Sequence, residues 1–225
     1  LKHNLDIHKI GAATIYLDNC RPPFEHPLVT WVPRKGRASF ADFIKIANID
    51  DSESTRETGC THLLFSNSDI VFDENISRLI SVVSEPLWAI CLTRREADGL
   101  FARNIEPLQS QDAWMIKKQP LPLDLVRQME SVKLGLPGCE HLFAAALVSN
   151  GYSLWNPCLD CIAVHTDPNP KVHEPGGERY WGLYAYVKEC SLSDIGRKKP
   201  DVAWAFAQKP GKYFDVMMRP YGFPE

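Results

Sequence analysis

The stretch THLLFSNSDIVFD, residues 61–73, decides which fold the rest of the chain can adopt. Residues 62–66 are a short apolar run with aromatic and branched side chains, which is typical of a strand buried on both faces. Small polar residues follow and end the strand, and Asp73 is placed to cap a helix. The pattern predicts that a buried strand delivers Asp69 to its carboxyl end, where open α/β sheets bind ligands. The alternative interpretation is that Asp69 only fixes the backbone of a strand-to-helix turn.

Strands and helices alternate on both sides of this stretch. The predicted strands are 13–17, 28–32, 62–66, 87–93, 113–116, 152–155 and 161–165, and the predicted helices are 1–10, 40–47, 74–83, 124–132, 140–150 and 180–190. This order predicts an α/β fold in one domain over residues 1–225, with a mostly parallel central sheet flanked by helices. A smaller antiparallel part is expected in the second half.

Length and composition limit the classes of function. The chain has 225 residues, 44% of them hydrophobic, which is ordinary for a globular domain with a full core. The net charge of −3 argues against nucleic-acid or anionic-membrane binding by the whole chain. We find no transmembrane segment and no signal peptide in the sequence. The chain starts with Leu rather than Met, which leaves open that it is part of a larger multidomain chain.

The seven cysteines are an odd number and lie mostly inside apolar runs. We therefore expect free thiols and a reducing, cytoplasmic location. Cys158 and Cys161 have the spacing of half a zinc site or of a redox pair, but the sequence holds no second pair to complete a zinc site. Structural thiols are the favoured interpretation.

Three further polar groups stand at the ends of predicted elements. Ser110-Gln111-Asp112 precedes a strand, Glu140-His141 begins a helix, and His165 ends a strand, with Asp167, His173 and Arg179 soon after it. Each group alone has a structural explanation as a turn, a first-turn acid or a satisfied strand-end histidine. Together with Asp69, they place four charged or metal-capable groups at element ends of one α/β sheet, which predicts a site.

The order and spacing of these motifs resemble the GT-A glycosyltransferases, which are single-domain α/β nucleotide-sugar transferases. Asn67-Ser68-Asp69 sits where that fold carries its Asp-x-Asp motif. The segment from Gly138-Cys139-Glu140-His141-Leu142 to Asn150-Gly151-Tyr152 resembles the "Glu-Asp … Leu … Gly-Tyr" helix of inverting members. Asn156-Pro157 followed by His165 resembles the strand whose histidine completes the metal or diphosphate site. Residues 110–114 match a segment of one branch of such transferases, and the resemblance covers about residues 28–180.

The resemblance implies a role for each candidate residue. Asp69 and His165 are expected to bind Mn²⁺ or Mg²⁺, and Glu140 is expected to be the general base, with Asp112 as the alternative. The expected nucleotide-binding residues are Asn67, Ser68, Arg37, Arg179 and Lys171. Lys171, His173 and Arg179 are placed to close over the diphosphate. Residues 1–100 would then bind the nucleotide and metal, residues 101–190 would hold the acceptor and catalytic groups, and residues 191–225 would be a tail packed on the domain.

The sequence departs from the family pattern in three places. Asn67 stands where the motif has its first Asp, and Cys139 and Glu140 stand where the helix has Glu and Asp. The strand that normally holds the nucleotide base should precede the first helix, yet residue 1 already has a helical pattern. Either that strand lies upstream of Leu1, or the assignment at the start is wrong.

The leading hypothesis is a metal-dependent, inverting glycosyltransferase that moves a sugar from a nucleotide-diphosphate sugar to a hydroxyl of a glycan or glycoprotein. A UDP-sugar is the expected donor. The first alternative is a non-catalytic carbohydrate- or nucleotide-binding module on the same fold. The second is a nucleotidyltransferase, whose basic glycine loop has its closest match at Arg34-Lys35-Gly36-Arg37. The expected partners are a nucleotide sugar and a glycan acceptor, with no nucleic acid.

Overall fold

The computed structural model describes residues 2–7, 10–18, 22–47, 60–100, 110–166 and 178–207, and within them the fold is mixed α/β. The helices are α1 (Lys2–Ile7), α2 (Phe40–Ala47), η1 (Glu74–Arg78), α3 (Leu79–Val82), α4 (Leu123–Met129), α5 (Cys139–Ser149) and η2 (Leu192–Asp194). The strands are β1 (Ala13–Asp18), β2 (Val29–Arg34), β3 (His62–Ser66), β4 (Ile70–Phe72), β5 (Trp88–Leu92), β6 (Arg94–Arg95), β7 (Ala113–Lys117), β8 (Ser153–Trp155), β9 (Ala163–His165), β10 (Gly182–Val187) and β11 (Val202–Ala207). None of the helices in these ranges has the length and apolar character needed to cross a membrane.

The described strands form four small sheets, so the prediction of one mostly parallel central sheet is wrong. The largest sheet has the order β3-β7-β5-β8, in which β7 is antiparallel to both neighbours and β5 is parallel to β8. The other sheets are β4-β9-β6, the parallel pair β1-β2 and the antiparallel pair β10-β11. Strand β7 runs antiparallel to both β3 and β5, which a mostly parallel sheet would not allow.

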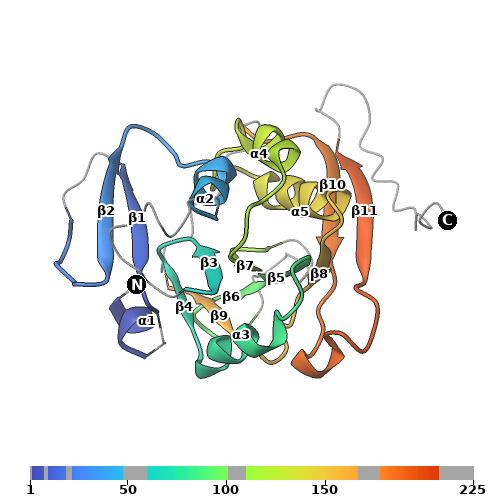
Figure 1. Ribbon diagram of the computed structural model, residues 1–225, viewed down its shortest axis with the longest axis horizontal. Coiled ribbons are helices and arrows are strands. Elements are labelled where there is room, and N and C mark those ends of the chain that lie inside the picture. The colour runs from blue at the N-terminus through green and yellow to red at the C-terminus, as the bar shows by residue number, and fades with distance from the viewer. Residues whose placement is uncertain are drawn as a thin grey trace.

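The four-stranded sheet is covered on both faces, as Figure 1 shows with α2, α4 and α5 on one side and α3 on the other. Successive residues of β5 point into two different cores: Ala89 and Cys91 pack under α2, α4 and α5, whereas Ile90 and Leu92 pack against η1 and α3. Strand β3 was expected to be buried on both faces, but its residues are only half-buried because it is an edge strand of the described sheet.

Helix α2 follows the prediction closely. Its expected apolar stripe of Phe40, Phe43, Ile44 and Ala47 is buried. The preceding Ser39 forms a reciprocal cap with Asp42: the Asp42 backbone N–H donates to Ser39 Oγ at 3.3 Å, and the Ser39 N–H donates to Asp42 Oδ2 at 2.7 Å. Phe40 then stacks on Phe143 of α5 with ring centroids 4.2 Å apart. These contacts fix α5, and with it the residues at the start of that helix.

The helix predicted after Asp73 forms in a different way. Residues 74–78 adopt a 3₁₀ helix, and only residues 79–82 are α-helical. The predicted stripe included Ile80, but this side chain is 40% exposed, because the tighter 3₁₀ turn changes which positions share a face. Asp73 does not cap the helix with its side chain. Its Oδ1 instead accepts a hydrogen bond from the Ile162 N–H at 3.1 Å, which ties this turn to the segment before β9.

The helix predicted over residues 180–190 is wrong. Residues 182–187 form β10, which pairs along its whole length with β11 and covers α5 (Figure 1). The sequence GLYAYV combines aromatic and branched residues, which favour strands over helices. Strand β11 lies in the predicted tail and does pack on the domain. Residues 208–225 lie outside the described residues.

Candidate functional site

The strand directions bring the predicted polar groups to one edge of the four-stranded sheet. Strands β3, β5 and β8 all run opposite to β7, so their carboxyl ends lie beside its amino end. The register shows this directly, since Ala113 at the start of β7 pairs with both Ser66 at the end of β3 and Leu92 at the end of β5. The residues that follow β3 and β5 therefore meet the residues that precede β7.

Asp112 is the centre of this meeting point. Asn67 Nδ2 donates to its Oδ1 at 3.2 Å, and Ser110 Oγ donates to its Oδ2 at 2.8 Å. An Arg94 guanidinium nitrogen, Nη1, lies 3.1 Å from the same Oδ2. The Asp112 residue is only 8% exposed, so this carboxylate is held by charge-assisted hydrogen bonds in a shielded place.

His165 is placed by the small sheet β4-β9-β6. Strand β4 runs antiparallel to β9 and β6 runs parallel to it, so the residue before β4 and the residue after β6 both lie beside the end of β9. Accordingly, Asp69 Oδ2 lies 3.1 Å from His165 Nε2, and Glu96 Oε2 lies 3.4 Å from Nδ1. The buried imidazole thus has a carboxylate at each ring nitrogen.

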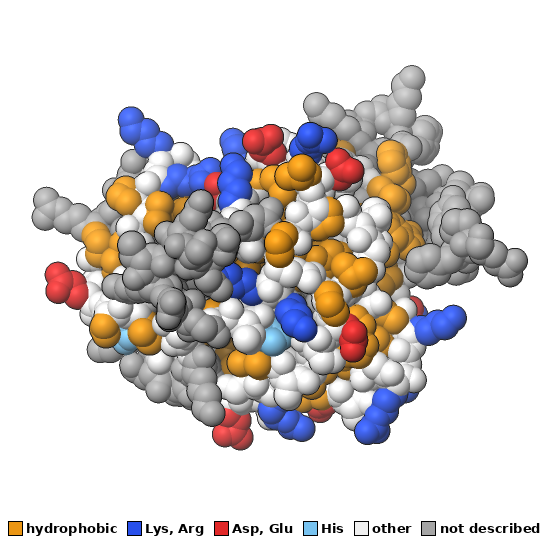
Figure 2. All heavy atoms as spheres, viewed as in Figure 1, with side chains coloured by type: hydrophobic (Ala, Val, Ile, Leu, Met, Phe, Trp, Pro, Cys, Tyr) orange, Lys and Arg blue, Asp and Glu red, His pale blue; other side chains and the backbone are white. Residues whose placement is uncertain are grey.

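Arg94 joins these two groups into one network. Its Nε lies 3.3 Å from Glu96 Oε1, and its Nη1 reaches Asp112. The network therefore runs from Asp69 through His165, Glu96 and Arg94 to Asp112. Figure 2 shows basic side chains and a histidine together near the middle of this face, where Figure 1 labels β6 and β9.

Glu140 adds a second carboxylate near Asp112. Gly138 precedes α5 with φ of +89°, a left-handed conformation that favours glycine, and a Cβ there would also meet the Tyr184 hydroxyl. Glu140 stands in the first turn and lines a narrow cavity with Asp112, Asn67 and other residues. Burial, the largest cause, and the charge of Asp112 together raise the pKa of Glu140 to about 7, against the opposing effects of hydrogen bonds and of the Arg94 charge.

The network carries more negative than positive charge. Three carboxylates belong to it, those of Asp69, Glu96 and Asp112, and Glu140 lies near Asp112, whereas the guanidinium of Arg94 pairs with Glu96 and Asp112. Excess buried negative charge is unfavourable unless a proton or a cation offsets it. Burial is the main cause of the raised pKa of Glu140, and the charge of Asp112 adds to it. A bound cation would offset the excess of negative charge.

Asp69 and His165 fit the ligand chemistry of a divalent ion. Asp69 Oδ1 is buried and has no hydrogen-bond partner among the described residues, although the side chain as a whole is 40% exposed. Neighbouring ligands of an octahedral ion with bonds of about 2.1 Å lie about 3.0 Å apart, close to the 3.1 Å between Asp69 Oδ2 and His165 Nε2. Within the described ranges no three or more His, Cys, Asp or Glu side chains gather as a metal cluster. Remaining ligands would therefore come from substrate oxygens and water, as is usual for Mg²⁺ with phosphates.

Ser68, Arg37 and Arg179, the other predicted nucleotide-binding residues that the structure describes, are not part of this network. Ser68 is exposed in the turn between β3 and β4. Arg37 Nη1 donates to the carbonyl oxygens of Leu134 and Gly135 at 3.3 and 3.1 Å, so it braces a loop that lines the Glu140 cavity. Arg179 lies over the ring of Trp181, 5.0 Å from its centroid. Lys171, His173 and Asp167 lie outside the described residues.

The sequence analysis missed Arg94 and Glu96. Both follow β5, a buried strand that ends at the same edge as β3. The rule that identified Asp69 (a polar residue just after a buried strand) applies equally to these two residues. The antiparallel direction of β7 was the missing information, because it makes residues 110–112 neighbours of both strand ends.

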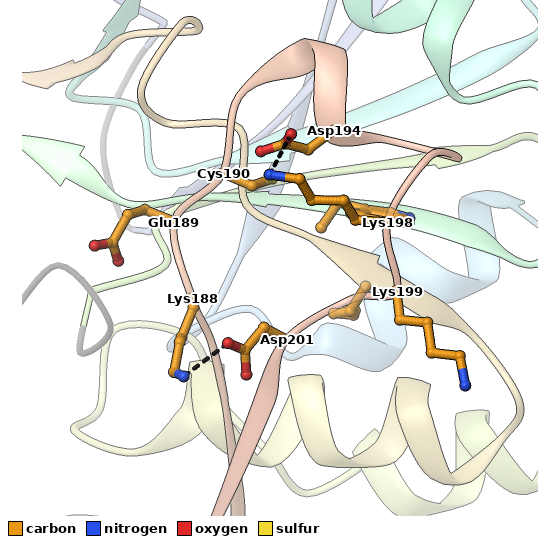
Figure 3. A pocket seen from close by; sticks show the side chains of 9 residues that line it. Lys188, Glu189, Cys190, Asp194, Lys198, Lys199 and Asp201 are labelled. Atoms are coloured by element: carbon orange, nitrogen blue, oxygen red, sulfur yellow. Dashed lines mark hydrogen bonds and ion pairs between the residues drawn. The ribbon is translucent and has the colours of Figure 1, made fainter.

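A second pocket lies between β8 and the β10–β11 pair and has a different character. Lys188 Nζ lies 2.7 Å from Asp201 Oδ2, and Lys198 Nζ lies 2.8 Å from Asp194 Oδ1. Figure 3 shows that, within each pair, the lysine and the aspartate point toward each other. Its charged groups largely neutralise one another, so we assign this pocket no chemistry.

Cys158 and Cys161 are buried, and their environment raises their thiol pKa values. Burial is the main cause and brings both to about 12. Such thiols remain protonated at neutral pH and are neither good nucleophiles nor good metal ligands. The favoured interpretation of the pair as structural thiols agrees with this environment.

The chain matches no protein-family model, and no curated protein or solved structure is significantly similar to it.

Proposed function

We propose that this protein is a metal-dependent, inverting glycosyltransferase with a GT-A-like fold, which transfers a sugar from a nucleotide-diphosphate sugar to a hydroxyl acceptor. A UDP-sugar is the proposed donor. One observation carries the proposal: a polar network runs from a pair suited to a divalent ion, Asp69 and His165, to Asp112, and the carboxylate of Glu140 lies near that end of it.

The Asp69 end suits a leaving nucleoside diphosphate. A bound Mn²⁺ or Mg²⁺ would offset the negative charge that gathers on the diphosphate as the glycosidic bond breaks. Glu96 lies at His165 Nδ1 and so orients the ring, which leaves Nε2 directed at Asp69. Histidine among the ligands favours manganese over magnesium.

The Glu140 end suits an attacking hydroxyl. A carboxylate with a pKa of about 7 is a stronger base than an ordinary glutamate and is still largely ionised just above neutral pH. Glu140 would take the proton of the acceptor hydroxyl as its oxygen attacks the anomeric carbon. Because one base acts in one displacement, the anomeric configuration inverts.

The geometry also accounts for Asn67 at the first motif position. Its amide donates to Asp112 Oδ1, which a carboxylate could not do without repulsion. Asn67 therefore supports the network without being a metal ligand. Asn in place of the Asp of the motif is therefore compatible with an enzyme.

The nucleotidyltransferase alternative has less support. Arg34 of its candidate basic loop forms a 2.6 Å ion pair with Asp42 of α2, and Arg37 is engaged with backbone carbonyls. Side chains already holding the scaffold are poorly placed to hold a triphosphate.

The test is release of nucleoside diphosphate from UDP-sugars with Mn²⁺, in the presence of a panel of glycoside acceptors. Glu140→Gln should lower turnover about 100- to 10,000-fold, the usual contribution of a general base, while nucleotide binding is retained. Glu130→Gln, at an exposed position on the surface, is the matched control. Equal turnover in wild type and Glu140→Gln would exclude Glu140 as the base, and release of pyrophosphate from a nucleoside triphosphate would favour the nucleotidyltransferase.

A further inference from the structure

The Arg94 guanidinium lies between two carboxylates from different parts of the site. Its Nε lies 3.3 Å from Glu96 Oε1, and its Nη1 lies 3.1 Å from Asp112 Oδ2. The nitrogens of a guanidinium form a rigid, planar fork, so it can hold two carboxylates at a set spacing and angle. The Arg94 side chain is only 20% exposed, which shields these contacts from water. The pairing therefore constrains Glu96 relative to Asp112.

Asp112 is the fixed end of this bridge. Asn67 Nδ2 donates to its Oδ1 at 3.2 Å, and Ser110 Oγ donates to its Oδ2 at 2.8 Å. The residue is buried, and both carboxylate oxygens already accept hydrogen bonds from neighbouring side chains. Asp112 can therefore serve as an anchor from which Arg94 orients Glu96.

The short strand β6 explains why Arg94 meets Glu96. Successive side chains of a strand point to opposite faces, so residues two positions apart meet on one face. Arg95, between them, turns the other way and donates from Nη2 to the Cys158 carbonyl at 3.2 Å. Because β6 pairs in parallel with β9, the residue after β6 lies beside His165 at the end of β9. Glu96 Oε2 accordingly lies 3.4 Å from His165 Nδ1.

We propose that Arg94 is a positioning residue: anchored on Asp112, it holds Glu96 so that His165 presents Nε2 to a divalent ion. The inference rests on the metal site of the proposed function. The partner at the second ring nitrogen of a metal-binding histidine fixes the tautomer and the orientation of the ring. Loss of such a partner typically weakens metal binding about 10- to 100-fold. Arg94 acts one contact further from the ion, through Glu96.

The charge of Arg94 alone would have the opposite effect on metal binding. A nearby cation repels a divalent ion, so removal of the charge strengthens metal binding if charge is the only contribution of this residue. Removal weakens metal binding if Arg94 positions Glu96. The sign of the change therefore separates the two explanations.

The test compares three single variants. Arg94→Gln removes the charge and the fork, whereas Arg94→Lys keeps the charge but replaces the fork with a single ammonium group. Arg95→Gln is the matched control, because it removes a neighbouring cation that points to the other face of β6. For each protein, calorimetry gives the Mn²⁺ dissociation constant, and thermal unfolding without metal shows that the variant is folded. Electron spin-echo spectroscopy of bound Mn²⁺ detects a coordinated histidine nitrogen.

Arg94→Gln should bind Mn²⁺ at least about tenfold more weakly than wild type, and the histidine signal of the bound ion should decrease. Arg94→Lys should also bind Mn²⁺ more weakly, although its charge is unchanged. Arg95→Gln should bind Mn²⁺ as tightly as wild type or more tightly. In a Glu96→Ala background, Arg94→Gln should cause no further loss, because the arginine acts through Glu96.

Four results would overturn the inference. These are unchanged or tighter Mn²⁺ binding in Arg94→Gln, an equal loss in Arg95→Gln, a further loss in the Glu96→Ala background, or a wild type that binds no Mn²⁺. Unchanged Mn²⁺ binding in Arg94→Gln, with active transfer by wild type, overturns this inference alone. A wild type that binds Mn²⁺ through Arg94, but releases no nucleoside diphosphate from any UDP-sugar, refutes the proposed transferase and leaves this inference standing.

Discussion

Two fully buried side-chain amides, Asn156 and Gln111, lie at the same edge of the four-stranded sheet and differ in their hydrogen bonding. Asn156 follows β8; its Oδ1 accepts from the Thr93 N–H at 3.1 Å, and its Nδ2 donates to Thr93 Oγ1 and to the Val187 carbonyl at 2.9 and 3.0 Å. Gln111 precedes β7 and has no side-chain partner among the described residues. Both residues are 0% exposed.

The difference separates a region whose polar groups are paired internally from the region that we propose to be functional. Around Asn156, every bond of the amide joins β8 to β5 and β10, so the polar group stabilises the fold and needs nothing further. Around Gln111, the carboxylates outnumber the cations. Both polar atoms of the Gln111 side chain, and Oδ1 of Asp69, have no hydrogen-bond partner among the described residues.

The largest effect on stability is expected at Asn156. Asn156→Leu removes three hydrogen bonds at a fully buried position, which should lower the free energy of unfolding by about 3 kcal/mol. Gln111→Met should change it by less than about 0.5 kcal/mol, since no described bond is lost. Urea denaturation of both variants checks the comparison. Equal losses would show that Gln111 has an internal partner.

A smaller, pH-dependent effect is expected at Glu140. Its folded-state pKa of about 7 lies above the ordinary value of 4.5, so the folded protein holds this proton more tightly than the unfolded chain. The stabilising contribution is full below pH 4.5, declines as the pH rises to about 7 and stays low above that. Glu140→Gln should therefore match wild type near pH 4 and be more stable near pH 8. Urea denaturation at the two pH values measures this, and a variant that is less stable at pH 8 would contradict the assignment.

The smallest effect is expected in the second pocket. Lys188 and Asp201 form an ion pair whose side chains are 49% and 62% exposed, and such pairs contribute about 1 kcal/mol or less. Lys188→Ala should lower the free energy of unfolding by no more than that and leave nucleotide binding unchanged. A marked loss of ligand affinity in this variant would move the site to this pocket.

The sequence predicted most elements and several site residues, because these depend on local patterns. The amphipathic stripe of α2 and the strand that leads to Asp69 both follow from residue spacing alone. The site pair Asp69–His165 and the pair Asn67–Asp112 also came from residues flagged in the sequence. They were expected to meet at the edge of one sheet, but Asp69 and His165 meet through the antiparallel pair β4–β9 of a separate small sheet.

The relative direction of the strands, and the sheet to which each strand belongs, could not be predicted from the sequence. The residue pattern of β7 does not indicate whether the strand runs parallel or antiparallel to its neighbours. Only its pairing with β5 places Asp112 beside Arg94. The run over residues 182–187 has apolar residues at positions compatible with helix or strand, and pairing with β11 decides in favour of a strand. Arg94 and Glu96 joined the site through these long-range pairings, which no local pattern encodes.

The most direct test of the account is a thermal-shift measurement with nucleoside diphosphates, with and without Mn²⁺, on wild type and Asp69→Ala. Asp124→Ala, on the exposed side of α4, is the control for loss of a carboxylate. A nucleotide at a hundred times its dissociation constant adds about 2.7 kcal/mol of stability, which is easily detected. The account predicts a Mn²⁺-dependent shift that is lost in Asp69→Ala and kept in Asp124→Ala. If none of the nucleotides shifts the unfolding temperature, or if the shift survives in Asp69→Ala, the account is contradicted.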